Sequence, residues 1–282
     1  MTVRVVCDST ADLDDAFRDA HRVQVVPLQV IIGDDSYRDG VDITPAELYG
    51  RMRRDGVSAR TSQPTPAEFE SVFRAITGAG DAVVCTTISS GLSGTYGSAT
   101  QAAEALAGRP IQVIDTRSVS VGHYAAVTEA VRLAEAGCDL DTVAAAVARL
   151  LPQIRLLFTV ETLEYLRRGG RIGGARALLG SMLDVKPILE MNGGSIEPVG
   201  RVRTYRRAVD SCAEAVARAA EDWGGARVLI AQGDAAEAAT QMKSRLEASL
   251  PGTQIPVLAV GPVIGAHAGP GAVGVAFHPP VS

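Results

Sequence analysis

Hydrophobic and polar positions follow two alternating patterns along the first half of the chain. Apolar runs typical of buried strands occur at residues 3–7, 23–32, 81–86 and 111–114. Helical spacing of apolar residues occurs at 11–20, 45–54, 67–76, 94–107 and 119–136. Within the second strand run, Pro27 favours a bend or an edge position. Strands that alternate with helices in this way predict right-handed crossovers and a parallel sheet.

Two of the predicted helices begin with a clear signal. Thr44-Pro45 and Thr65-Pro66 each place a capping threonine before a proline at the first helical position. Glu68 adds a partial capping box to the second of them. The residues between them, 60–66, are predicted to form a polar loop.

The second half combines the same patterns with glycine-rich turns. Strands are predicted at 156–160, 186–191, 195–199 and 227–232, and two short strands end the chain, one of them at 272–277. Helices are predicted at 205–222, at 235–250 and, after the glycine-rich segment 169–174, up to Leu183. Asn192-Gly193-Gly194 is typical of a hairpin turn.

The length of 282 residues allows two α/β domains or one large one. A boundary near Pro152 divides the chain into an N-terminal α/β domain at 1–152, with a parallel sheet, and a C-terminal α/β domain at 153–282. The hairpin at Asn192 gives the second domain a mixed sheet.

Composition narrows the possible partners. Hydrophobic residues make up 46% and charged residues 21%, an ordinary globular balance. Aromatic residues are only 4%, so the core consists mainly of Val, Leu, Ile and Ala, and a surface that stacks nucleic-acid bases is disfavoured. The net charge of -5 also argues against nucleic acids or anionic membranes as partners.

One uncharged stretch, 255–277, is about long enough to span a bilayer. Its three prolines and five glycines would leave a lipid-exposed helix with unsatisfied backbone groups, so short buried strands and turns are expected instead. The four cysteines lie far apart without a C-x-x-C pair, and the N-terminus shows no signal-peptide pattern. A cytoplasmic protein without an integral membrane segment is therefore expected.

Gly269-x-Gly271-x-x-Gly274 matches the dinucleotide-binding fingerprint in its letters. The fingerprint requires a helix after the glycines, whereas here a predicted strand follows. A nucleotide site is therefore not expected, and no P-loop pattern occurs. The four histidines lack metal-ligand spacing, so no metal site and no cofactor are expected.

Ser93 lies between a predicted strand and a predicted helix and allows three interpretations. The order Ser93, Asp115, His267 resembles that of an α/β-hydrolase triad, but Thr95 stands where the nucleophile elbow needs glycine. The second interpretation is a helix cap. The third is an anion site at a helix N-terminus, which needs no proton abstraction.

Seven segments in order along the chain resemble those of the DegV family of fatty acid-binding proteins. They are CDSTADL at 7–13, RTSQPTPAEF at 60–69, SSGLSGTYGSA at 89–99, DTRSVSVG at 115–122, LEYLRRGGRIGG at 163–174, VKPILEMNGGSIEPVGRVRT at 185–204 and GAHAGPGAVG at 265–274. The resemblance implies a two-domain α/β fold that buries one long-chain fatty acid and needs no cofactor. It also implies a lipid-binding protein without catalytic residues of its own.

The same resemblance implies which residues hold the carboxylate. Thr61 and Ser93 match the family's carboxylate-binding hydroxyls, Ser62 adjoins Thr61, and His267 matches a histidine near the headgroup. Members of this family often carry threonine on both sides of that histidine, and this chain has Ala266 and Ala268 instead.

Some members present their fatty acid to an ATP-dependent fatty acid kinase that makes an acyl phosphate, a precursor in phospholipid metabolism. We hypothesise that Arg171 and Arg203 lie near the carboxylate and favour docking of such a kinase. Two alternatives remain open at this point, a serine hydrolase of acyl esters that uses Ser93 and His267, and a binder of phosphate ligands.

Overall fold

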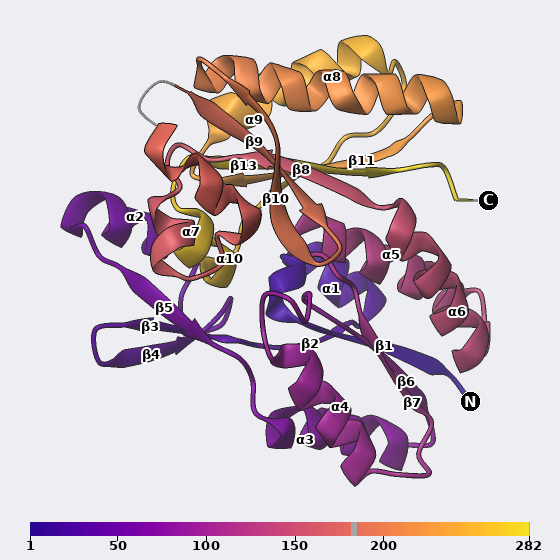
Figure 1. The fold of residues 1–282 in the computed structure, drawn as a ribbon. Helices are drawn as coiled ribbons and strands as arrows, with labels where there is room; N and C mark the ends of the chain where they lie inside the picture. Colours follow the sequence, from indigo (N-terminus) through magenta and orange to yellow (C-terminus); the bar gives the residue numbers. More distant parts are fainter. Residues whose placement is uncertain (182–184, 282) are drawn as a thin grey trace.

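The computed structural model describes residues 1–181 and 185–281, which form three sheets (Figure 1). The first sheet is parallel, with the order β2-β1-β6-β7. Its strands are β1 (Val3–Asp8), β2 (Gln24–Val26), β6 (Ala82–Thr87) and β7 (Ile111–Asp115). The parallel sheet predicted for the first half is thus confirmed.

Helices cover both faces of this sheet, which explains why its strands are continuous apolar runs. The helices are α1 (Asp15–His21), α3 (Pro66–Gly78), α4 (Thr95–Ala105), α5 (Val121–Glu135) and α6 (Leu140–Leu150), with 3-10 turns at η1 (Ser9–Ala11) and η2 (Leu151–Gln153). Phe69 and Phe73 of α3 pack on one face of the sheet, and Val127 of α5 packs with Val143 of α6 on the other. Helix α6 was not predicted from the sequence.

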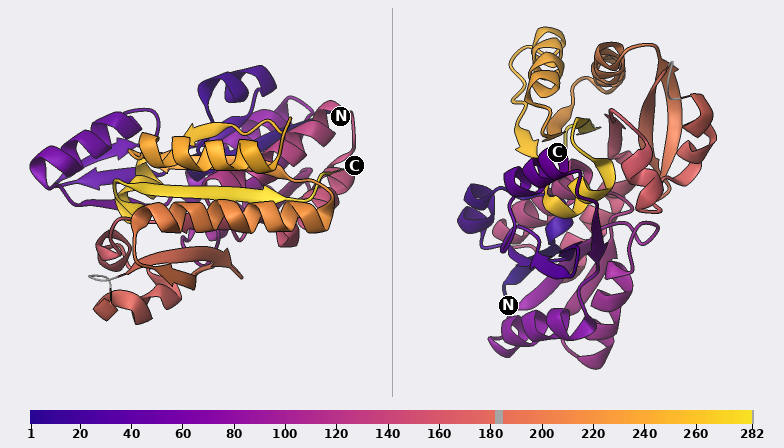
Figure 2. Two further views of the ribbon diagram at one scale, coloured as in Figure 1. Left: turned by 90° about the horizontal axis from the view of Figure 1, so that it is seen from above. Right: turned by 90° about the vertical axis from the view of Figure 1, so that its left-hand side faces the viewer.

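The second sheet is mixed, with the order β10-β9-β8-β13-β11-β12, and only β11 and β12 are parallel among its pairs. Its strands are β8 (Arg155–Thr159), β9 (Lys186–Asn192), β10 (Ser195–Val202), β11 (Arg227–Gly233), β12 (Val257–Ala259) and β13 (Ala272–His278). The long helices α8 (Tyr205–Trp223) and α9 (Ala236–Ser249) cover its outer face (Figure 2). Strands of the first sheet come from residues before 152 and those of the second from residues after it, while the exact boundary stays a prediction.

A third, antiparallel sheet was not predicted. It has the order β4-β3-β5 and consists of β3 (Gln29–Ile32), β4 (Asp35–Arg38) and β5 (Ala59–Ser62). Helix α2 (Pro45–Asp55) packs beside it, and so does α10 (Pro262–Ala268) from the other end of the chain. This contact brings residues near 60 next to residues near 265.

Two sequence expectations were therefore wrong. Residues 255–277 contain the helix α10 as well as strands, because Pro262 stands at its first turn, where proline favours a helix. Thr61 lies in β5 and not in a loop, because the backbone of Ala59–Ser62 pairs with β3.

Smaller differences concern helix boundaries. The helix expected at 11–20 begins only at Asp15, since Asp14 caps it and Asp12 is left-handed with a φ of 51°. Helix α7 (Glu164–Arg168) precedes the glycine-rich segment, and a 3-10 stretch, η3 (Gly173–Ser181), begins at its end. The predicted end at Leu183 lies outside the described residues. Among those described, none of the helices combines the length and the apolar character needed to cross a bilayer.

Candidate functional site

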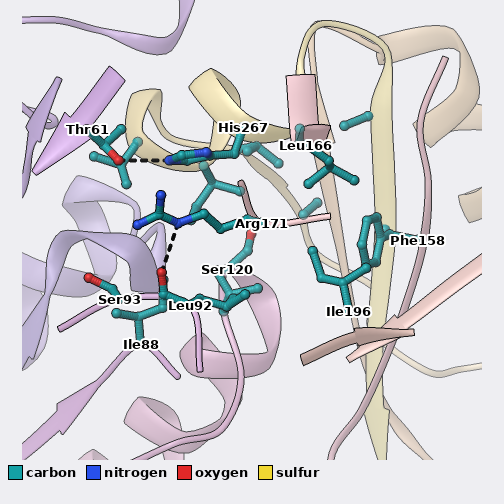
Figure 3. Close-up of a pocket in the computed structure, with 18 of the residues that line it drawn as sticks. Thr61, Ile88, Leu92, Ser93, Ser120, Phe158, Leu166, Arg171, Ile196 and His267 are labelled. Carbon is teal, nitrogen blue, oxygen red and sulfur yellow. Dashed lines mark hydrogen bonds between the residues drawn. The ribbon is translucent and has the colours of Figure 1, made fainter. Parts of the chain in front are cut away.

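A cavity of about 330 Å³ lies between the second sheet, the third sheet with α10, and the loops after β6 and β7 (Figure 3). This volume is in the range usual for small-molecule sites. Four polar side chains gather at one end, and they are Thr61, Ser93, Arg171 and His267. Ser62 and Gln63, which follow Thr61 in the chain, also line the cavity. Apart from Ser120, the remaining lining side chains are aliphatic or aromatic, including Leu156, Phe158, Leu166 and Ile196.

Thr61 and His267 form a hydrogen-bonded pair at the polar end. The distance between Thr61 Oγ1 and His267 Nε2 is 2.8 Å, which joins β5 to α10. Burial, reinforced by the nearby charge of Arg171, lowers the pKa of His267 to about 4. The imidazole is therefore neutral near pH 7, with one nitrogen that donates and one that accepts.

The other ring nitrogen of His267 is enclosed by the glycine-rich segment. Nδ1 is buried without a hydrogen-bond partner among the described residues. Gly169 lies against it so closely that an added Cβ would be 2.1 Å from Nδ1. The absence of a side chain at Gly169 is thus what lets the His267 ring occupy this position.

Ser93 approaches the same end from the loop between β6 and α4. Its Oγ is 2.9 Å from Thr95 Oγ1 and accepts only a long bond, 3.4 Å, from the Thr95 amide. Gly94 occupies the N-cap position, and no side chain described in the structure caps α4 there. Ser93 is therefore not the cap itself, and its hydroxyl stands beside helix N–H groups that favour an anion.

Arg171 holds two segments of the polar end together. Its Nε donates to the carbonyl of Leu92 at 3.0 Å, and its Nη1 donates to that of Gly169 at 2.7 Å. It thereby links the residue before Ser93 to the glycine that supports His267. Arg203, exposed between β10 and α8, is not among the described residues that line the cavity.

The hydrolase arrangement is absent from this site. His267 Nε2 is hydrogen-bonded to Thr61, and Nδ1 has no hydrogen-bond partner among the described residues. Neither ring nitrogen is therefore bonded to Ser93. Asp115 instead accepts hydrogen bonds from Ser90 and from the amide of Arg117. Ser93, Asp115 and His267 therefore do not form a relay.

Two further polar residues line the cavity that the sequence did not single out. Gln63 donates to Ser98 Oγ at 3.1 Å and lies against Gly94. Ser120 donates to the buried carboxylate of Asp12 and has a positive φ of 50°, which non-glycine residues seldom adopt. The motif DTRSVSVG contains Ser120 but does not indicate this conformation.

The described residues contain no group of three or more His, Cys, Asp or Glu side chains placed to hold a metal ion. Gly269 and Gly271 lead into β13, which contains Gly274, as predicted, and not into a helix that faces a phosphate.

Comparison with known proteins gives consistent matches over nearly the whole chain. The family described as "Uncharacterised protein, DegV family" matches residues 2–280. DegV domain-containing proteins of Deinococcus radiodurans and Streptomyces coelicolor are each 39% identical, with 99% and 97% of both chains covered.

Solved structures extend these matches to the fold. A DegV family protein from Thermus thermophilus, described by its fatty acid binding, has a TM-score of 0.94 and 37% identity, over 99% of this chain and 100% of that one. A stearic acid-binding protein from Eubacterium ventriosum has a TM-score of 0.91 and 31% identity, over 98% of each chain. The fold, the site and these similarities together show that this chain belongs to the DegV family.

Proposed function

We propose that this protein binds one long-chain fatty acid, with the carboxylate at Thr61, Ser93 and His267 and the acyl chain in the apolar part of the cavity. The observation that carries the proposal is the division of the cavity into one polar end and a long apolar remainder. The Thermus and Eubacterium relatives, both more than 30% identical, are described as binding fatty acids, which supports the same ligand class here.

The hydrogen bond between Thr61 and His267 determines how the carboxylate is held. A carboxylate only accepts hydrogen bonds, so the Thr61 hydroxyl must donate its proton to it. The Thr61 oxygen then accepts from His267 Nε2, which places the imidazole proton on Nε2 and leaves Nδ1 as a bare acceptor. His267 thus acts as a positioning residue that orients the Thr61 hydroxyl toward the ligand.

Ser93 and Ser62 are the further hydroxyl donors. Both line the cavity, and Ser93 stands beside the uncapped first turn of α4. Hydrogen bonds to an ionised group are about twice as strong as neutral ones, so a few such donors can replace a salt bridge.

The apolar part supplies most of the gross affinity. Each buried CH₂ contributes about 0.8 kcal/mol, so a chain of about sixteen carbons contributes roughly 10 kcal/mol before the costs of association. An aliphatic cavity lining suits such a chain, and the headgroup needs correct placement more than strong charge pairing.

Solvent extraction of the purified protein followed by mass spectrometry tests the proposal. The expected result is one long-chain acid per protein, taken up again after delipidation. A delipidated protein that takes up no fatty acid would refute the proposal, and protection by phosphate compounds alone would favour a phosphate binder instead.

We further propose that the protein is not an enzyme but presents its fatty acid, in the cytoplasm, to an ATP-dependent kinase. Arg171 supports this, since its guanidinium lies at the polar end, where the acyl phosphate would form. Free thiols at Cys7, Cys85 and Cys212 suit a reducing compartment.

Charge reversal tests the kinase partnership. Arg203→Glu should abolish acyl phosphate formation with the kinase and leave bound lipid unchanged, whereas Arg218→Glu, a matched exposed arginine on α8, should change neither. Arg171→Glu should reduce lipid binding as well, because Arg171 also holds Leu92 and Gly169. Unchanged turnover in Arg203→Glu would rule out a docking role for that residue.

A further inference from the structure

Gly274, the last glycine of the fingerprint-like segment, belongs to a strand whose two faces carry side chains of different size. Val273, Val275 and Phe277 point into the core beneath α8 and α9. Ala272 and Ala276 belong to the core on the opposite, cavity side, and Gly274 lies between them on β13. Ala272 and Gly274 line the cavity from this face with little or no side chain, which leaves volume there, and Val273 also borders the cavity.

Phe158 borders this space on the neighbouring strand. In the antiparallel pairing of β13 with β8, Gly274 stands directly opposite Phe158, and both line the cavity. A Cβ at Gly274 would lie 3.0 Å from Phe158 Cβ and 3.2 Å from the carbonyl of Leu157. The aromatic side chain of Phe158 thus lies beside a position without a side chain.

Ala231 continues the same row on the other side. It pairs with Gly274 from β11 and also lines the cavity. One large and two small residues, Phe158, Gly274 and Ala231, therefore stand side by side across three paired strands. In Figure 3, Phe158 and Ile196 lie at the end of the cavity opposite Thr61 and Ser93.

We propose that the row Phe158–Gly274–Ala231 determines which acyl chain lengths this protein accepts. This inference rests on the proposed function, and it names the part of the cavity that selects among fatty acids. The row lies within hydrogen-bonded strands of a close-packed sheet, so it yields little to a longer chain. Each methylene that fits or fails to fit changes the affinity about fourfold.

The proposal predicts opposite effects for substitutions that open and that fill the row. Phe158→Ala enlarges the far end of the cavity, so longer acids should bind more tightly relative to shorter ones. Gly274→Ala and Ala231→Val add methyl groups to the row, so shorter acids should bind more tightly relative to longer ones. A residue that served only to pack the core would lower stability without shifting the preferred length in opposite directions.

A competition experiment measures this preference. The delipidated wild type and the three variants are incubated with an equimolar mixture of saturated acids of twelve to twenty carbons, and the bound acids are extracted and quantified by mass spectrometry. We expect the most abundant bound acid to lengthen by about two carbons in Phe158→Ala and to shorten in the other two, consistent with a fourfold change per methylene. Phe277→Leu, on the outer face of the same sheet, is the matched control and should keep the wild-type profile.

The possible failures are separable. If the wild type takes up no acid, the proposed function is wrong. If the wild type loads and every variant keeps its profile, or if Phe277→Leu shifts it as much as Phe158→Ala, the selection role of this row is overturned. If Gly274→Ala does not fold, Ala231→Val alone tests the effect of filling the row.

Discussion

Replacing Thr61 with valine tests the proposed headgroup contact, because valine keeps the branched shape and removes only the hydroxyl. In the ligand-free protein, the change leaves His267 Nε2 without its 2.8 Å partner. A buried polar group that loses its partner destabilises the fold by about 1–3 kcal/mol. We therefore expect a measurable fall in the free energy of unfolding of the delipidated protein.

The effect on binding is separate from this loss of stability. His267 Nε2 lacks its Thr61 partner both with and without the ligand, so that term largely cancels in the binding free energy. What remains is the hydrogen bond to the carboxylate, worth about 1.5–3 kcal/mol, which corresponds to affinity weaker by about 10- to 150-fold. The acyl contacts are untouched, so the loss should be the same for acids of different length.

Displacement of a fluorescent fatty acid measures this loss, with urea unfolding of the delipidated protein alongside it. Thr240→Val is the control, since that exposed hydroxyl is bonded only to the carbonyl of Ala236 within α9. If Thr61→Val binds fatty acids within about twofold of the wild type, a factor well below that of one charge-assisted hydrogen bond, the carboxylate does not lie at Thr61.

Three further predictions concern the same end of the cavity. Since the pKa of His267 falls from 6.5 to about 4 on folding, the free energy of unfolding should decrease by an amount on the order of 3 kcal/mol as the pH falls through that interval, where the unfolded state binds the additional proton. Urea unfolding of His267→Gln should lack this part of the pH dependence; an identical profile would contradict it. Gly169→Ala should weaken fatty acid binding by about tenfold, because its Cβ would lie 2.1 Å from His267 Nδ1, whereas Gly97→Ala, which meets open space, should not. An activated acyl ester should give no burst of product with the wild type or with Ser93→Ala, since Ser93 is bonded to Thr95 and not to His267; a burst that Ser93→Ala removes would establish a hydrolase.

Much of the fold was predictable because its signals are local. The threonine–proline pairs at 44 and 65 begin α2 and α3 with full capping boxes. The turn at Gly193 and Gly194 joins β9 to β10, and both glycines have positive φ, as the hairpin requires.

Two of the parts that were not predicted, β5 and α10, depend on contacts distant in sequence. The polar strand β5 has no apolar alternation and is a strand only because it pairs with β3. Helix α10 has seven residues, too few to show a period, and it is stabilised by packing against α2 and β3. The Gly261-Pro262 step was the one available signal for its start.

The individual site residues were identified from family motifs and not from the pattern of apolar and polar positions. Thr61 and His267 are 206 positions apart, and their hydrogen bond exists because the third sheet packs on α10. The role of Arg171 in joining Leu92 to Gly169 has no counterpart in the sequence pattern, which shows it only as one of several arginines.

The polar end of the cavity is where four distant parts of the chain meet, namely β5, the loop before α4, the glycine-rich segment and α10. A ligand bound there holds all four together, so it favours the native state of the whole molecule by mass action. At a free ligand concentration one hundred times the dissociation constant, this linkage amounts to about 2.7 kcal/mol. Resistance to proteolysis should therefore rise and fall with occupancy, so the lifetime of this protein in a cell would follow the supply of its ligand.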